Sequence, residues 1–430
     1  MAWFVAKKDF RVLLTTAYAA FGVYFCMYAF RKPFTVGTFE GQSWLGVDFK
    51  IVLIIAQVLG YMLSKFLGIK LISELKPQQR LGYLLGMIGV AELALILFGL
   101  LPAPYNIGAM FLNGLCLGMI WGIVFSYLEG RQHTEILGVA LCSSFIVSSG
   151  AVKSVGSLVL NEMGISEQWM PSVTGAFFLI LLFSFALLLN RIPAPNETDK
   201  ILKSERRPMG RKERVSVFVK FSVPLTVLIL FYVCLTALRD FRDNFSREIW
   251  DSLGYADNAS IFTLSEVPIA ILVLLSMGFL TIVKNNFRAF MAYHYLLLFG
   301  ALLIGICSLM FQIQAIGPVF WMVCVGLGLY LCYVPFNGIF FDRMIATFRI
   351  DGNVGFLIYL ADAFGYLGSV GVLLYKNFGQ HKVSWLQFFI QASYVIAIIG
   401  ALSTLISLLY FRQKRKNGII ADQHTPLVNL

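Results

Sequence analysis

The sequence contains few charged residues for its length. Asp, Glu, Lys and Arg together make up 13% of the 430 residues, whereas 58% are hydrophobic. A soluble protein of this size needs many more polar side chains to cover its surface, so the composition excludes a soluble globular fold. At roughly 20 apolar residues per membrane span, the length allows about a dozen transmembrane helices.

Signatures of catalysis and of metal binding are missing as well. The chain has no glycine-rich phosphate loop, no His-Glu-x-x-His motif and no nucleophile elbow. Its seven cysteines lie in apolar segments without paired spacing, which favours neither a disulfide framework nor a metal site. The N-terminus lacks a short apolar core followed by a cleavage site, so we expect the first apolar segment to remain as a span. We predict neither an enzyme nor a bound metal or cofactor.

Twelve apolar runs follow one another along the chain. Each is long enough for a membrane-spanning helix and too long for the alternating strands of a membrane barrel. The runs lie near residues 10–31, 48–70, 81–101, 105–127, 136–160, 168–190, 218–242, 259–283, 288–312, 316–341, 353–375 and 385–411. They predict an all-α polytopic membrane protein with twelve transmembrane helices.

One polar, proline-containing stretch separates two sets of six runs. It predicts an N-terminal six-helix bundle over 1–190, a basic linker over 191–217, a C-terminal six-helix bundle over 218–411 and a tail over 412–430. Most Lys and Arg residues outside the runs lie near the N-terminus, in this linker and in the tail. The positive-inside rule then places both termini and the linker in the cytoplasm. The net charge of +11 is therefore a topology signal and needs no nucleic-acid partner.

The first apolar run ends in a charged residue, Arg31. A charge inside a membrane span is costly, so it marks a functional site by default. On a helix Arg31, Tyr28 and Tyr24 share one face, because they are three and four residues apart. A permanent cation flanked by phenol hydroxyls suits an anionic ligand. The alternative is that Arg31 lies at a helix end and extends to the outer headgroups.

The second half contains a counterpart of this arginine. Arg31 lies 21 residues after Phe10, and Arg239 lies 21 residues after Phe218. Two parallel six-helix repeats joined by a basic cytoplasmic linker are the layout of the major facilitator superfamily, whose site lies between the halves. Two empty arginines facing each other would repel, and a dianion between them would draw the halves together. The alternative for Arg239 is an ion pair within its own helix, with Asp243 four residues on.

Other charges inside the runs are expected to pair. In the major facilitator layout the second run faces the eleventh and the fifth faces the eighth. The depths of Lys65 and Asp362 then allow an inner pair, and those of Lys153 and Glu266 an outer one. Either pair gates the pathway or contacts the substrate. A purely structural pairing is the alternative, since buried charges need partners wherever they lie. Arg242 is nearer the surface and is expected at the rim.

Some polar residues and glycines are interpreted as packing features. Glu92 and His294 lie in runs that are peripheral in this layout, and we expect each to form a hydrogen bond between helices. Gly114, Gly118 and Gly122 recur at every fourth position, which allows close helix contact.

Several motifs occur in the order typical of one transporter family. They are Tyr24…Tyr28-Ala-Phe-Arg31-Lys32-Pro-Phe34, Gly60-Tyr61-Met-Leu-Ser64-Lys65-Phe66, Ala237-Leu238-Arg239, Glu266, Tyr333-Val-Pro335 and Phe364-Gly365-Tyr366-Leu367-Gly368. In this order they resemble the organophosphate:phosphate antiporters, the family of the glycerol-3-phosphate and hexose-phosphate transporters. The resemblance implies exchange of a phosphorylated metabolite for inorganic phosphate by alternating access.

The resemblance also implies which residues contact the substrate and which partners the protein has. Arg31 and Arg239 are the phosphate clamp, and the expected contacts around them are Tyr24, Tyr28, Tyr61, Lys65, Lys153, Tyr333 and Tyr366. The partners are a small organic anion, inorganic phosphate and the lipid bilayer. We expect a monomer in the cell (inner or plasma) membrane. The chain departs from the family where Cys142-Ser-Ser-Phe145 replaces a pocket histidine and Thr236 replaces a tyrosine.

Two other functions stay open. A proton-coupled symporter of another organic anion needs a carboxylate that changes protonation during the cycle, and Asp362 and Glu266 are the candidates. A membrane sensor that binds a phosphorylated metabolite without transporting it can use the same fold. The tail from Arg412 onward is short for a signalling domain, which favours transport.

Overall fold

The computed structural model describes residues 2–128, 131, 134–193, 218–337, 339–348, 354–379 and 382–416. Within these ranges the regular structure is helical apart from one short hairpin, as the long apolar runs predict. The hairpin pairs β1 (Ser43–Trp44) with β2 (Val47–Asp48) in antiparallel register. Most of the predicted linker and tail lies outside the described residues.

The first half of the chain contains seven helices among its described residues. They are α1 (Ala2–Met27), α2 (Phe49–Glu74), α3 (Arg80–Leu100), α4 (Asn106–Leu117), α5 (Ile120–Leu128), α6 (Thr134–Asn161) and α7 (Met170–Asn190). Two 3₁₀ turns, η1 (Tyr28–Phe30) and η2 (Pro33–Val36), follow α1. The predicted run 105–127 is divided into α4 and α5 next to Gly118, and together they form one candidate span.

The second half contains eight α-helices among its described residues. They are α10 (Ser222–Asn244), α11 (Ser246–Ser252), α12 (Ile261–Thr281), α13 (Asn286–Gln312), α14 (Pro318–Phe336), α15 (Ile339–Phe348), α16 (Val354–Leu374) and α17 (Trp385–Lys416). In the described part of the chain, eleven segments are long and apolar enough to cross a membrane. The 21-residue helix α16 occupies the position of the remaining predicted run.

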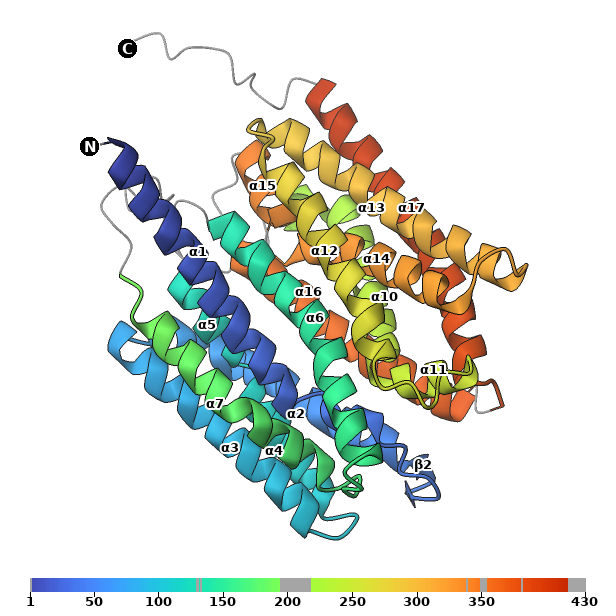
Figure 1. Cartoon of the computed structure of the whole chain (residues 1–430). Coiled ribbons are helices and arrows are strands. Elements are labelled where there is room, and N and C mark those ends of the chain that lie inside the picture. Colours follow the sequence, from blue (N-terminus) through green and yellow to red (C-terminus); the bar gives the residue numbers. More distant parts are fainter. Residues whose placement is uncertain are drawn as a thin grey trace.

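The helices are arranged as two bundles that meet along an interface. Figure 1 shows α1–α7 on one side and α10–α17 on the other. Between the two sets, α6 lies along α12, and α2 lies along α16. We call the end of the molecule that carries β2 and α11 the hairpin end, and the end where α1 begins the terminal end. Any site between the bundles is therefore built from both halves of the chain.

The outward surface of the bundles is apolar. Ile180 on α7, Phe279 on α12 and Leu402 on α17 are 81%, 69% and 56% exposed. Large apolar side chains this exposed on several helices are favourable in a lipid bilayer and costly in water. The chain is therefore a multi-pass membrane protein.

Close packing between α2 and α4 positions part of the interface. A Cβ atom on Gly114 would overlap the carbonyl oxygen of Gln57, and one on Gly118 would lie 2.6 Å from the carbonyl oxygen of Tyr61. The predicted close contact of these glycines is therefore confirmed. Because α2 and α4 pack so closely, the backbone position of Tyr61 on α2 is constrained by this contact.

Two buried polar residues bond to neighbouring helices, as the sequence predicts. Ser172 on α7 donates a hydrogen bond of 2.7 Å to the Glu92 carboxylate on α3. The His294 ring on α13 lies 2.9 Å from the Ser407 hydroxyl on α17. Both residues have local partners away from the interface, which supports a role in packing.

Replacing Gly114 by alanine is expected to destabilise the protein, because the new methyl group overlaps the Gln57 carbonyl. Overpacking of this kind costs about 1–3 kcal/mol. Gly108→Ala on the same helix is the matched control, because a Cβ at Gly108 meets no atom within 4 Å. Thermal unfolding of the detergent-solubilised variants measures the difference, and equal melting temperatures would contradict the packing described.

Candidate functional site

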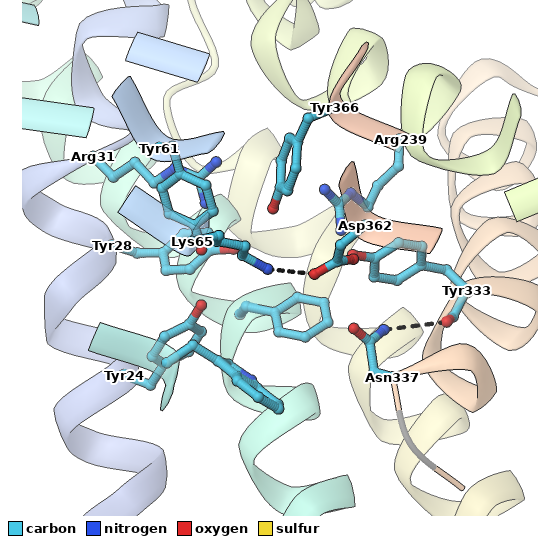
Figure 2. A pocket seen from close by; sticks show the side chains of 12 residues that line it. Tyr24, Tyr28, Arg31, Tyr61, Lys65, Arg239, Tyr333, Asn337, Asp362 and Tyr366 are labelled. Atoms are coloured by element: carbon cyan, nitrogen blue, oxygen red, sulfur yellow. Dashed lines mark hydrogen bonds and ion pairs between the residues drawn. The ribbon is translucent and has the colours of Figure 1, made fainter. Parts of the chain in front are cut away.

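A cavity lies at the interface between the two bundles. It has about 440 Å³ of atom-free space, part of it open to solvent. Both halves contribute to its lining, which consists of Tyr24, Tyr28, Arg31, Tyr61, Lys65, Trp121, Phe145, Arg239, Tyr333, Asn337, Asp362 and Tyr366. Figure 2 shows Arg31 and Arg239 on opposite sides of this space. Eight of the nine predicted substrate contacts are therefore brought together, the exception being Lys153.

The Arg31 side chain is buried at the cavity wall. Helix α1 ends at Met27 and the chain continues as a 3₁₀ turn, so Arg31 is presented just beyond the regular helix. The residue is 6% exposed, and its guanidinium carbon lies 4.0 Å from the ring centroid of Tyr61 and 5.8 Å from that of Tyr28. Among the described residues no carboxylate pairs with it, and its Nε has no hydrogen-bond partner. A buried guanidinium in this position does not extend to the headgroups.

Arg239 lies on α10 at the opposite wall. Its guanidinium carbon is 4.1 Å from the ring centroid of Tyr333. Its Nη2 donates to the carboxylate of the adjacent Asp240 at 2.6 Å, and its Nε donates to the same oxygen at 3.2 Å. The intrahelical partner is therefore Asp240, and the alternative of a pair with Asp243 is wrong.

Lys65 and Asp362 form an ion pair across the cavity. The Lys65 ammonium on α2 lies 2.5 Å from the Asp362 carboxylate on α16, so the pair joins the two halves (Figure 2). The contact is the one that the sequence predicts, and its role in gating stays a prediction. The Tyr232 hydroxyl donates to the other carboxylate oxygen at 2.5 Å. The sequence analysis missed Tyr232, although it lies two turns before Arg239 on the same helix face.

The predicted pair of Lys153 and Glu266 is wrong. Lys153 on α6 contacts the carboxylate of Asp243, and Glu266 on α12 accepts a 2.5 Å bond from Arg242. Helices α6 and α12 do pack together, but α10 places a closer partner beside each charge. In the described part of the chain, Lys153 lines neither this cavity nor the smaller one described next. Its predicted substrate contact is absent from this arrangement.

The position predicted for Arg242 is also wrong. Arg242 is 4% exposed, and besides the Glu266 pair it donates to the carbonyl oxygen of Met322 at 3.3 Å. It is an interior residue of the second bundle, because its partners lie on α12 and α14 of the same bundle.

A second, smaller cavity adjoins the first on the side of the hairpin end. Its lining shares Tyr28, Arg31, Phe145 and Arg239 with the first cavity and adds Lys32, Asp240, Asp243 and Tyr330. The two arginines therefore lie where the two spaces meet, with carboxylates of α10 beyond them.

Ion pairs join the halves at the hairpin end. Asp243 is shared by two cations of the first half, Lys153 and Lys32, the latter at 2.5 Å. Lys50 on α2 pairs with Glu248 on α11. The sequence analysis assigned no site role to Lys32, although it directly follows Arg31 in the motif that carries the resemblance.

Neither a metal-ligand group nor a disulfide occurs among the described residues. The described residues contain no group of three or more His, Cys, Asp or Glu side chains that would hold a metal ion. All seven cysteines are free thiols. The chemistry of the cavity is that of fixed cations, carboxylates and phenol hydroxyls.

Comparison with known proteins identifies a family and a fold. The model of a family of unknown function, DUF5690, matches residues 33–414. No curated protein matches the sequence. Among solved structures, a D-xylose-proton symporter is similar at a TM-score of 0.62 and 13% identity, over 93% of this chain and 97% of the other.

A single-residue mutant of the nucleoside transporter NupG is similar at a TM-score of 0.58 and 12% identity. The match covers 93% of this chain and 100% of that one. At such low identity the likeness concerns the fold alone. The chain is a polytopic helical protein with the major facilitator fold, as its sequence predicts.

The Lys65–Asp362 pair predicts a specific pattern of rescue. Lys65→Asp and Asp362→Lys alone each place like charges together and are expected to lower the melting temperature of the detergent-solubilised protein. The double variant restores opposite charges and is expected to recover part of the lost melting temperature. The matched control is the swap of Lys153 with Glu266, which gives no recovery because the two are not partners. Equal behaviour of the two double variants would contradict the pairing.

Proposed function

The chain belongs to DUF5690, a family of unknown function, and we propose that it is a secondary transporter of a small organic anion. The anion binds between the two halves, and alternating access carries it across the membrane. A phosphate ester exchanged for inorganic phosphate is the specific form that we propose. The fold supports transport in general, since both similar solved structures are named as transporters.

The guanidinium of Arg31, which has no carboxylate partner among the described residues, is the observation that carries this proposal. The neighbouring cations Lys32, Lys65 and Arg239 each have a carboxylate partner, whereas Arg31 has tyrosine rings around it. A buried charge without a partner is costly. An anionic ligand supplies the missing counter-charge, and the planar fork of an arginine fits the paired oxygens of a phosphate or carboxylate.

The charge balance of the cavities favours a dianion. Among the described residues, four cations (Arg31, Lys32, Lys65 and Arg239) and three carboxylates (Asp240, Asp243 and Asp362) line the two cavities. A fifth cation, Lys153, is paired with Asp243 just outside the linings. With all groups ionised, five against three leaves two positive charges. A phosphate monoester carries about −1.5 to −2 at neutral pH. A ligand of that charge would neutralise the site.

The tyrosines suit the uncharged part of such a substrate. Tyr24, Tyr28, Tyr61, Tyr333 and Tyr366 all line the larger cavity and are at most 8% exposed. Phenol hydroxyls donate and accept hydrogen bonds, and the ring faces pack against carbon. A hydroxylated organic body attached to the phosphate would find both kinds of contact.

Exchange for inorganic phosphate is proposed because both anions share the group that Arg31 would bind. The main alternative is proton-coupled symport of another organic anion. Of the two candidate carboxylates for that mechanism, Asp362 lines the cavity, where it is paired with Lys65, whereas Glu266 is paired with Arg242 outside the lining. The sensor function predicts binding without exchange.

The location and assembly follow the same proposal. We infer a monomer in the cell membrane. From the distribution of Lys and Arg residues we infer that both termini lie in the cytoplasm. The hairpin end then faces outward and the terminal end inward.

Phosphate self-exchange in vesicles reconstituted with the purified protein tests the proposed function. The unmodified protein is expected to exchange external radioactive phosphate for internal phosphate. Arg31→Lys keeps the charge but loses the fork, so exchange is expected to fall about tenfold or more. The matched control is Arg247→Lys, at an arginine that pairs with Asp251 outside the cavities.

Two results would contradict the proposal in different ways. Absence of exchange by the unmodified protein, with phosphate binding retained, would favour a sensor. Undiminished exchange by Arg31→Lys would show that the fork of this arginine does not hold the anion.

A further inference from the structure

The two arginines of the site are in different electrostatic states. Arg31 has no carboxylate partner among the described residues, whereas Arg239 is paired with Asp240 on the same helix. Both cations line both cavities, so both are available to one ligand. A site built only to bind an anion tightly would leave both arginines free.

Asp240 contacts Arg239 through only one of its two carboxylate oxygens. The Nε and Nη2 atoms of Arg239 both donate to Oδ1 of Asp240, at 3.2 and 2.6 Å. The other oxygen, Oδ2, is buried and has no hydrogen-bond partner, although the residue is only 3% exposed. A carboxylate oxygen without a donor is costly in the interior, so the carboxylate is incompletely satisfied in this state.

Other cations line the space around this carboxylate. Asp240 lines the smaller cavity together with Arg31 and Lys32, besides Arg239 itself. A carboxylate that released Arg239 would therefore remain in a cationic surrounding. The cost of giving up its present partner is lowered accordingly.

We propose that Asp240 is a built-in counter-ion that competes with the substrate anion for Arg239. The inference rests on the proposed function, because it assumes that an anion binds between Arg31 and Arg239. In the structure Asp240 holds Arg239. When the anion binds Arg31, which has no carboxylate partner among the described residues, it also displaces Asp240 from Arg239, and Asp240 returns when the anion leaves.

Such competition has a physical advantage for a transporter. Without the Asp240 charge, the excess in and beside the cavities rises from two positive charges to three. In a site of low dielectric constant a dianion would then bind more tightly. Tighter binding of the ligand lowers the half-saturating concentration but does not speed the cycle, since the anion must also be released. Asp240 therefore sets the balance between affinity and turnover.

Phosphate self-exchange by Asp240→Asn tests the inference. The half-saturating concentration of radioactive inorganic phosphate is expected to fall about tenfold, and the maximal exchange rate is expected to fall about fivefold. Asp240→Glu keeps the charge and is expected to keep the half-saturating concentration within about twofold of the unmodified protein. Asp251→Asn, which breaks the pair with Arg247 outside the cavities, is the matched control for a lost carboxylate.

The outcomes separate this inference from the proposed function. No exchange by the unmodified protein would overturn the proposed function itself. If the unmodified protein exchanges phosphate but Asp240→Asn raises or does not change the half-saturating concentration, only the role of Asp240 is overturned. A shift in Asp240→Glu as large as that in Asp240→Asn would also overturn it, because the charge would not be the cause.

Folding is controlled by thermal unfolding of each variant in detergent. Asp240→Ser is a second neutral variant in case Asp240→Asn does not fold. If both neutral variants fail to fold, Asp240 has a structural role and the competition is overturned.

Discussion

The need to compensate buried charge governs the interface between the two halves. Among the described residues four ion pairs cross it, and in each the first half supplies the cation and the second half the carboxylate. The pairs are Lys32 and Lys153 with Asp243, Lys50 with Glu248, and Lys65 with Asp362. Because breaking one partner of a buried pair leaves an uncompensated charge, these contacts hold the halves in register. Arg31 stands out against this pattern as the cation that no carboxylate among the described residues neutralises.

A short stretch of α10 carries four charged residues that point in different directions. Successive residues on a helix point about 100° apart. Arg239 therefore reaches the cavity, Arg242 turns into its own bundle toward Glu266, and Asp243 faces the first half. Asp240 lines the smaller cavity beside Arg239. The run Arg239-Asp240-Phe241-Arg242-Asp243 thus serves the substrate site, the core of the bundle and the interface within about one and a half turns.

The parts of this arrangement that depend on helix periodicity and span order were predictable from the sequence. The run lengths predicted the helices, and the repeat predicted that Arg31 and Arg239 face each other across the interface. The depths of Lys65 and Asp362, on helices that face each other in the major facilitator layout, predicted their contact. The partners of Lys153 and Glu266 were not predictable in this way. Depth fixes where a charge lies along the membrane normal, whereas the choice of partner depends on the rotation of each helix. Tyr232 was missed for a related reason, since a tyrosine in an apolar run is usually a packing residue.

The paired state of Arg239 changes how ligand binding is coupled to movement. Two empty arginines were expected to repel each other, so that a dianion would draw the halves together. In the structure Asp240 neutralises Arg239, and ion pairs on both sides of the arginines already attract the halves. The two halves are therefore held together by ion pairs of the protein itself. Under the proposed function, a ligand would act instead by exchanging partners, since an anion that occupies Arg31 and approaches Lys65 would compete with Asp362 for the contact that joins α2 to α16. That contact lines the cavity, whereas the Lys50–Glu248 pair at the hairpin end does not. Under the proposed function, binding would therefore weaken the terminal-end connection selectively, and the bound anion would shift the balance between conformations that are closed at one end or the other.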